Sequence, residues 1–458
     1  MKIYLFEDSI NYMSQSQNYI INTTEVVIDS YTDQIQMPKR ANIYGVKGKI
    51  DLFSPDTIMN ILINGTLKLD ENIARPNISE NLRILIRSND ANIYLLMSNL
   101  KLNNINVYKD VANEYGIFSI FIKPLYLQEK NVTITNASFK TTGYILFTND
   151  PMSFYANNIF IDFHANMAGI IIMSSCNYPE ANKTGMIYAN NLTVVNAAER
   201  VAYIRYGVLI HNGGNDMTIS NSYFDLYSPL VNSRCMATKY LNPTCFPNDG
   251  IIQKVSVINT TWTMPINPYG DRFICFYCNW DSGYYRKIVL TYSNNLHKDI
   301  LNARYSAPFL IASPLSTLVI QNNEYINVST VFGALYSTRS DTVLLENNFY
   351  IDSESMGSGT FSFKDTNEVV MRNITHKNLN STGKSSLRFL YVSIKNGGNF
   401  TGENLFFENV DFQTSQSIVI DGNLDVYRLN FLNYTNVRVG NKNSLISLNS
   451  FKFLSISN

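Results

Sequence analysis

The sequence is poor in charged residues and has no excess of either sign. Only 16% of the 458 residues are charged, and 36 Lys and Arg residues balance 36 Asp and Glu residues. Proteins that bind nucleic acids or anionic membrane surfaces gather basic residues on one face, so this composition argues against both kinds of partner. A surface without net charge instead favours self-association.

Long apolar runs are also missing. No stretch approaches the roughly 18 apolar residues that a membrane-spanning helix needs. The opening residues, "MKIYLFEDSINYM", place Glu7 and Asp8 where a secretory signal keeps its apolar segment. We therefore expect no membrane span in this chain, and an upstream segment would have to supply any export signal.

Histidine is scarce, with four residues in all, and residues suited to catalysis do not gather in one stretch. The best candidate segment, "RYGVLIHNGGNDMTISNSYFD", holds Arg205, His211, Asp216 and Asp225 but no Asp-Asp pair. Hydrolysis of a glycosidic bond by a general acid and base needs two carboxylates about 5 to 10 Å apart. The sequence thus predicts no catalytic residues, no metal ligands and no cofactor, and His211 is interpreted as a loop or strand residue.

The five cysteines lie in the middle of the sequence. Cys235 and Cys245 flank a short insertion, and a disulfide between them would stabilise the fold by roughly 2 to 3 kcal/mol. Cys275 and Cys278, in "CFYC", are compatible with a redox pair, half of a zinc site or a local disulfide, but a zinc site needs a second pair at comparable spacing. We expect disulfides at these four positions, without a fixed connectivity and with Cys176 unassigned, and disulfides would place the chain outside the cytosol.

What the sequence does have is a repeated pattern built on asparagine. "DTVLLENNFYIDS", from Asp341, and "NEVVMRNITHKNL", from Asn367, both read apolar-x-apolar-x-Asn, followed three residues later by Tyr350 or His376. The template recurs at spacings of roughly 21 to 38 residues, in or near the range of solenoid repeats. The asparagines that we predict to form one ladder are Asn136, Asn190, Asn221, Asn259, Asn294, Asn322, Asn347 and Asn373. Another match ends at Asn104, and looser matches end at Asn157, Asn404 and Asn430.

The segments between the asparagines indicate β-strands. Runs such as "FSIFI", "GIIIM" and "YGVLI" are rich in β-branched and aromatic residues, and none has the amphipathic helix of a leucine-rich repeat. At this point the chain resembles the right-handed parallel β-helix superfamily, the pectin-lyase-like fold, over about residues 90 to 440. The resemblance implies an all-β, right-handed parallel β-helix with loop insertions. We expect less regular rungs in residues 1–90 and the asparagine ladder in residues 91–458.

Asparagine suits the corners of such a fold for two physical reasons. It tolerates left-handed backbone conformations better than other non-glycine residues, and its amide can both donate and accept between successive rungs. We expect the ladder amides to be buried, so that Asn136, Asn259 and Asn373 carry no glycans although each begins an Asn-x-Ser/Thr triplet. His297 and His376 occupy the template's aromatic position and are interpreted as packing residues.

Thirteen Asn-x-Ser/Thr triplets are present, of which roughly nine would arise by chance in so Asn-rich a sequence. Outside the ladder we predict glycosylation among Asn22, Asn64, Asn77, Asn182, Asn191, Asn327, Asn380 and Asn399. Asn191 follows ladder residue Asn190 and is expected to point the opposite way, because side chains alternate along a strand.

Two functions remain open at this stage. In composition and architecture the chain is similar to extracellular surface proteins of protists, among them the mastigoneme-type subunits of ciliary hairs. That similarity implies an extracellular structural glycoprotein whose partners are copies of itself or related β-helical subunits, with covalent N-glycans. The strand-like termini predict that both ends continue into further sequence or into a neighbouring subunit. The alternative is a carbohydrate-active or glycan-binding protein of the same fold.

Overall fold

The computed structural model describes only part of the chain. The described residues are 2–4, 18–20, 25–28, 49–51, 59–63, 66–70, 77–86, 92–96, 99–109, 120–122, 130–141, 146–148, 152–163, 172–174, 186–195, 210–212, 216–225, 231–233, 252–264, 276–278, 287–303, 309–312, 317–330, 336–355, 361–378, 390–412, 418–439 and 446–457. Side chains are described from residue 133 onward, within parts of these ranges.

The described elements are β-strands joined by short turns, with no helix among them. None of these segments could therefore cross a bilayer as a helix. Neighbouring strands of successive rungs run parallel, as in the pairing of β11 (Lys130–Thr141) with β13 (Met152–Phe163). The predicted all-β parallel β-helix is confirmed. Contacts divide the chain into two compact units, residues 1–216 and 217–458. The division expected near residue 90 stays a prediction.

In unit 1, each rung between residues 77 and 212 has two described strands. The strands β7, β9, β11, β13 and β15 pair in succession on one face, and β8, β10, β12, β14 and β16 pair in succession on another. The strands of this unit are β1 (Lys2–Tyr4), β2 (Asn18–Ile20), β3 (Glu25–Ile28), β4 (Lys49–Asp51), β5 (Met59–Ile63), β6 (Thr66–Asp70), β7 (Asn77–Ile86), β8 (Asn92–Leu96), β9 (Asn99–Lys109), β10 (Ile120–Ile122), β11 (Lys130–Thr141), β12 (Leu146–Thr148), β13 (Met152–Phe163), β14 (Ile172–Ser174), β15 (Met186–Val195) and β16 (Ile210–Asn212).

Unit 2 begins with three strands per rung. Its strands are β17 (Asp216–Ser220), β18 (Tyr223–Asp225), β19 (Val231–Ser233), β20 (Ile252–Ile258), β21 (Thr261–Met264), β22 (Phe276–Cys278), β23 (Lys287–Ser293), β24 (Leu296–Ala303), β25 (Phe309–Ala312), β26 (Thr317–Gln321), β27 (Glu324–Thr330), β28 (Tyr336–Arg339), β29 (Thr342–Glu346), β30 (Phe349–Ile351), β31 (Glu354–Ser355), β32 (Phe361–Lys377), β33 (Leu390–Glu408), β34 (Asp411–Phe412), β35 (Ile418–Thr435), β36 (Arg438–Val439) and β37 (Ile446–Ser457).

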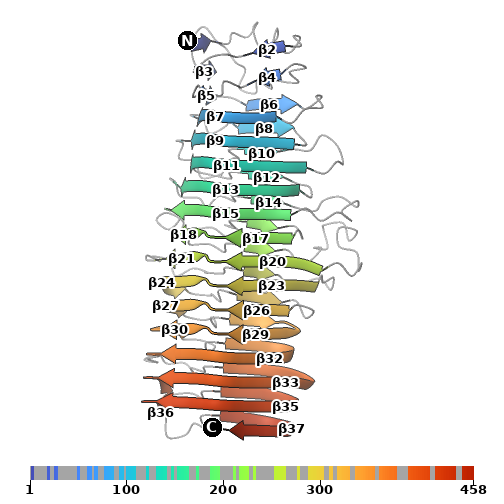
Figure 1. The fold of residues 1–458 in the computed structure, drawn as a ribbon, viewed down its shortest axis with the longest axis vertical. Coiled ribbons are helices and arrows are strands. Elements are labelled where there is room, and N and C mark those ends of the chain that lie inside the picture. Colours follow the sequence, from blue (N-terminus) through green and yellow to red (C-terminus); the bar gives the residue numbers. More distant parts are fainter. Residues whose placement is uncertain are drawn as a thin grey trace. The chain divides into compact units, whose positions relative to one another are not determined.

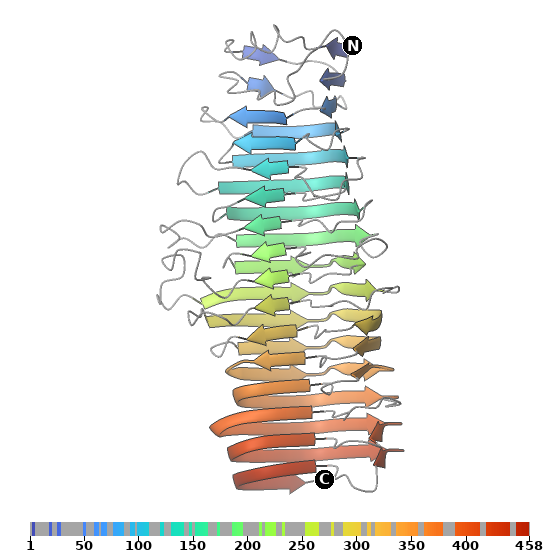
Figure 2. The same cartoon turned by 180° about the vertical axis from the view of Figure 1, so that it is seen from behind.

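Each strand in this part of unit 2 pairs with the strand one rung later. Thus β20, β23, β26 and β29 lie one above the next (Figure 1), and β21, β24, β27 and β30 follow the same order. The shorter strands β22, β25 and β28 form a further face, whose stacked arrows are visible from behind (Figure 2). In the last rungs, one long strand replaces several shorter strands of the preceding rungs. For example, β32 alone pairs with the three strands β28, β29 and β30.

The two apolar positions of the template form one part of the core of unit 2. Leu318 and Ile320 are fully buried, and the residues in register with them one rung later, Val343 and Leu345, are buried as well. Gly402 takes the second position in β33, where an added Cβ atom would lie 2.9 Å from Cδ1 of Leu429. Alternation along each strand therefore fills the interior with side chains and leaves the other face to solvent.

Candidate functional site

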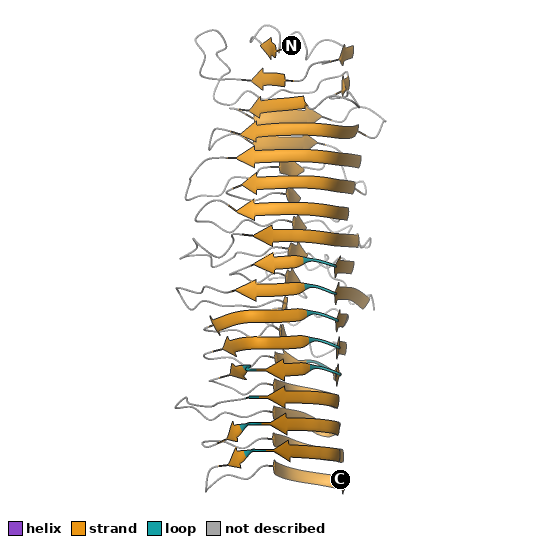
Figure 3. Cartoon of the chain, turned by 60° about the vertical axis from the view of Figure 1, so that its left-hand side comes forward, coloured by secondary structure: helices purple, strands orange, loops and turns teal. Residues whose placement is uncertain are grey.

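The template asparagines occupy one turn of each rung, directly after the first strand. Their φ angles lie between 50° and 57° in unit 2, for Asn221, Asn259, Asn294, Asn322, Asn347, Asn373 and Asn404. This left-handed region is costly for most side chains and is reached most readily by Gly, Asn and Asp. Figure 3 shows several of these turns in teal, one above another. The backbone of the corner therefore explains the residue type.

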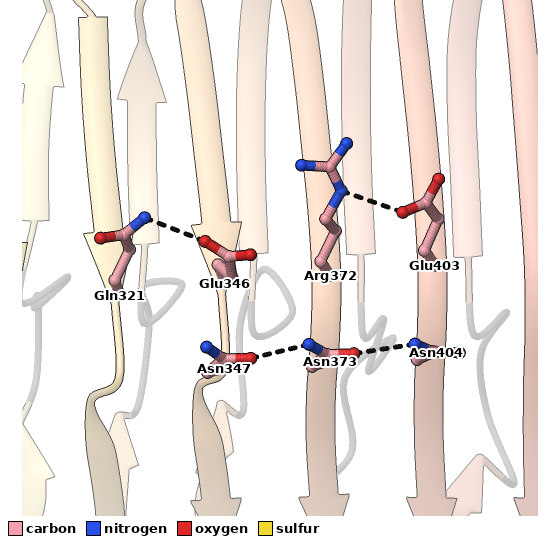
Figure 4. A network of polar contacts seen from close by, with 7 residues as sticks. All are labelled: Gln321, Glu346, Asn347, Arg372, Asn373, Glu403 and Asn404. Carbon is pink, nitrogen blue, oxygen red and sulfur yellow. Dashed lines mark hydrogen bonds and ion pairs between the residues drawn. The ribbon is translucent and has the colours of Figure 1, made fainter.

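Side-chain amides connect these corners into a column that we call the outer ladder. In unit 2, Asn373 donates through Nδ2 to Oδ1 of Asn347 at 2.7 Å, and Asn404 donates to Asn373 at 2.8 Å (Figure 4). Asn259 donates to Asn221 at 2.7 Å in the same way. In unit 1 the corresponding bonds run from Asn158 to Asn136 at 2.9 Å and from Asn191 to Asn158 at 2.6 Å.

The expectation that the template asparagines are buried is wrong. Asn136, Asn259 and Asn373 are exposed, because the left-handed residue at the corner turns its side chain outward. The residue that follows turns inward instead, as Thr260 shows with an exposure of 1%. The absence of glycans at the three template triplets remains a prediction. Its physical reason is now that these side-chain amides are hydrogen-bonded in the outer ladder, and not that they are buried.

The predicted register is also wrong by one residue in β15. Asn191, and not Asn190, has the left-handed backbone and continues the ladder, so it does not point away from it as expected. Asn190 lies beside Asn157 and donates to its Oδ1 at 2.7 Å. The neighbouring residues "MIYA" are all apolar, so alternation alone could not tell which two of them are buried. The looser matches at Asn157 and Asn430 shift in the same way, since Asn158 and Phe431 hold the corner with φ angles of 56° and 54°.

An inner ladder lies one residue after the outer one in three rungs of unit 2. Asn295, Asn323 and Asn348 are buried, and the Oδ1 atom of each accepts the backbone N–H one rung earlier, at 2.9 to 3.0 Å. Nδ2 of Asn323 also donates to Oδ1 of Asn348 and to the backbone carbonyl of Tyr292, both at 3.0 Å. The expected buried ladder thus exists in these three rungs, but in the second asparagine of each pair and not in the template asparagine.

A second outer ladder lies five residues after the first, and sequence reasoning missed it. Its positive-φ residues are Asp299, Asn327, Asp352, Asn378, Asn409 and Asn436. Asn327 donates to Oδ1 of Asp299 at 2.9 Å, and Asn436 donates to Asn409 at 2.7 Å. The signal was present in the sequence as an Asn or Asp five residues after each corner from Asn294 onward.

The aromatic position of the template forms a continuous stack inside unit 2, which we call the ring column. Successive ring centroids are 4.5 to 5.9 Å apart, and every member is buried. The column consists of Phe224, Trp262, His297, Tyr325, Tyr350 and His376. The interpretation of both histidines as packing residues is confirmed.

Burial controls the chemistry of these two histidines. Desolvation lowers the pKa of His297 and the pKa of His376 to about 3, because the interior disfavours the charged imidazolium. Nε2 of His297 lies 2.6 Å from the hydroxyl of Tyr292. Both rings are therefore neutral at ordinary pH and serve the core as flat polar rings.

Charged side chains on the outside of unit 2 pair along the solenoid. Nε of Arg372 lies 2.9 Å from Oε2 of Glu403, and Nε2 of Gln321 donates to Oε2 of Glu346 at 3.0 Å (Figure 4). Lys377 pairs with Glu408 at 2.7 Å. Each exposed pair contributes little to the stability of the fold. Through these pairs, however, polar side chains of one rung interact with those of the next rung.

Several predicted residues lie outside the described side chains. These are Cys235, Cys245, Cys275 and Cys278, the triplets at Asn22, Asn64, Asn77, Asn182 and Asn380, and His211. Asp216, the first residue of β17, and Asp225, the last residue of β18, are both half-buried. Among the described residues, no three of His, Cys, Asp and Glu gather in a group that could hold a metal ion.

Comparisons with known proteins assign no family to this chain. No protein-family model and no curated protein matches the sequence. Among solved structures, the chain is similar to the Streptococcus pneumoniae surface protein and adhesin PfbA, with 12% sequence identity and a TM-score of 0.32, over 87% of this chain and 91% of that one. A likeness at this level adds nothing on function.

Proposed function

We propose that this protein is an extracellular structural glycoprotein, a β-helical rod that associates with copies of itself or related β-helical subunits in a filament or surface coat. The observation that carries the proposal is the repetition of hydrogen-bonded asparagines at the same corners, rung after rung, in the described parts of both units. These bonds are spread along the solenoid. A stack whose neighbours stabilise one another locally is what a stiff, extended support requires.

The outer face of β13 and β15 supports lateral association with a second copy. Tyr155, Phe160 and Met186 are exposed by 42%, 43% and 49%. Tyr155 also stacks on Tyr188 with ring centroids 5.0 Å apart and an interplanar angle of 6°. Exposed apolar side chains on neighbouring strands favour contact with another protein surface, and the net charge of zero removes long-range repulsion between copies.

Sedimentation velocity of the secreted full chain over a range of concentrations tests this proposal. We expect concentration-dependent assemblies, and we expect Tyr155→Lys to reduce them by about tenfold in apparent affinity because it places a charge in the apolar face. Glu324→Gln, at an exposed position of unit 2, makes the same change in net charge and serves as the control. A chain that stays monomeric throughout and cleaves polysaccharides would contradict the proposal and favour the carbohydrate-active alternative.

A further inference from the structure

Two large apolar side chains stand exposed together near the end of unit 2. Phe406 of β33 and Phe431 of β35 have exposures of 42% and 56%. Phe406 is in register with Asn433, which lies two residues after Phe431 and is itself exposed. Since neighbouring parallel strands are about 4.8 Å apart, the side chains of Phe406 and Asn433 leave the same outer face side by side.

Phe431 also occupies a backbone conformation that does not suit it. With a φ angle of 54°, Phe431 occupies the outer-ladder corner of its rung, the position that Asn404 occupies in the previous rung. A bulky residue in the left-handed region is a true outlier, and such strained, exposed positions often mark a contact. Asparagine holds this corner in the preceding rungs, so the phenylalanine replaces a ladder member with an exposed aromatic ring.

Asn433 begins the triplet Asn433-Tyr434-Thr435, which is an acceptor sequence for N-glycosylation. Tyr434 points inward and stacks on Phe407 at 4.8 Å, which leaves Asn433 and Thr435 on the outside. The hydroxyl of Thr435 donates to Oδ1 of Asn433 at 3.5 Å. The two polar groups that define the acceptor sequence are therefore neighbours on an accessible face.

Other described acceptor asparagines are held differently. Asn191, Asn259 and Asn373 each donate through Nδ2 to the Oδ1 atom of the preceding rung, at 2.6 to 2.7 Å, and Asn327 donates to Asp299. Asn399 is half-buried, with its Oδ1 atom out of contact with solvent. Asn433 stands in neither outer ladder.

We propose that Asn433 carries an N-linked glycan whose first N-acetylhexosamine lies over the rings of Phe431 and Phe406. The C–H groups on one face of a pyranose pack well on an aromatic ring, so the sugar would cover the apolar surface that these two side chains expose. In the modification, Nδ2 of Asn433 forms a bond to C1 of the sugar, and the C1–O bond to the diphosphate of a lipid-linked oligosaccharide donor breaks. The lipid diphosphate leaves with the bonding electrons, and the proton lost from Nδ2 passes to solvent. The proposal rests on the extracellular function proposed above.

Glycopeptide mass spectrometry of the full chain, secreted from a eukaryotic host through an added signal sequence, tests the modification. We expect Asn433 to be occupied in most molecules and Asn373 to be empty, and Asn433→Gln to remove one glycan mass. An unoccupied Asn433 beside occupied triplets elsewhere would overturn this inference and leave the proposed function standing. Failure of self-association with Asn433 occupied would overturn the proposed function and leave the glycan standing.

Thermal unfolding tests the contact between sugar and rings. We expect Asn433→Gln to lower the unfolding midpoint by roughly 2 to 4 °C in the glycosylated wild-type background, because the rings lose their cover. In the Phe406→Ala background the same change should lower it by less than half as much. An equal shift in both backgrounds would overturn the packing of the glycan on the rings. The same set of proteins made in bacteria, without glycans, gives the effect of the substitutions alone.

Discussion

At the scale of single residues, asparagine fills two positions with opposite requirements. In the pairs Asn294-Asn295, Asn322-Asn323 and Asn347-Asn348 of unit 2, the first asparagine, such as Asn322, takes the left-handed corner and faces solvent. The second, such as Asn323, is buried and satisfies backbone groups of the neighbouring rungs. The first is selected by backbone conformation and the second by hydrogen bonding in the interior, so the two respond differently to substitution.

Replacing Asn323 by Ala is expected to destabilise unit 2 by about 2 to 4 kcal/mol. The change removes the acceptor of the Asn295 N–H and the donor to the Tyr292 carbonyl, and leaves buried polar groups without these bonds. Asn322→Gly is the matched control, because Gly accepts the left-handed conformation and only one exposed bond is lost, at less than about 1 kcal/mol. Urea unfolding measures both, and equal losses would contradict the division of roles.

Replacing Phe431 by Asn in the unglycosylated chain is expected to stabilise it by about 1 kcal/mol. Asn tolerates the positive φ of this corner and can extend the outer ladder from Asn404. Phe406→Asn serves as the control, since Phe406 has no positive φ angle and gains no ladder partner of this kind. A chain that is equally or less stable after Phe431→Asn, in chemical unfolding, would show that the phenylalanine is not strained there.

At the scale of elements, the ring column joins the second strand of one rung to the second strand of the next through buried side chains, in β18, β21, β24, β27 and β30. Trp262 and Tyr325 enclose His297, with centroid distances of 5.9 and 4.5 Å. Such stacking adds to apolar burial, and a histidine can take part only while it is neutral. The stability of unit 2 is therefore tied to pH through two positions of this column.

Acidification is expected to destabilise unit 2 between about pH 6.5 and pH 3. The folded pKa of His297 and His376 is about 3, against an ordinary value of 6.5, so the unfolded chain binds protons in this window that the folded chain does not. Stability is thus complete above pH 6.5 and falls as pH falls, by about 2 kcal/mol for each histidine at pH 5. In chemical unfolding at pH 7.5 and pH 5, His376→Phe should lose about 2 kcal/mol less than the wild type. An unchanged pH dependence would mean that His376 is not buried as described.

Part of the arrangement of these elements could be predicted from the sequence alone. The repeat of apolar pairs before Asn347 and Asn373 predicted the parallel solenoid and the two buried positions, because strand alternation and corner chemistry are local properties. The template could not predict which asparagine faces inward. That depends on the geometry of the turn, which directs the side chain of the residue after the left-handed corner into the core. In β15, four consecutive apolar residues hid the register, and only pairing with β13 determines it.

At the scale of the whole molecule, the described residues present repeating columns on both sides of the strands. Inside unit 2, apolar pairs, the inner ladder and the ring column continue from rung to rung, and outside, amide ladders and ion pairs do the same. Each rung contacts its neighbours and gains most of its stability from them. This organisation suits a support that is extended by adding further rungs or further copies, and it is the basis of the structural function that we propose.

The most direct test of this account is X-ray fibre diffraction, or the power spectrum of electron micrographs, from aligned assemblies of the secreted protein. If copies associate as β-helical rods with their axes along the filament, a strong reflection near 4.8 Å must appear parallel to the filament axis, because the strands lie across it. Regular filaments with this meridional reflection are the predicted result. Assemblies without it, or a protein that forms no ordered assemblies at any concentration, would contradict the claim that this chain is a structural β-helical subunit.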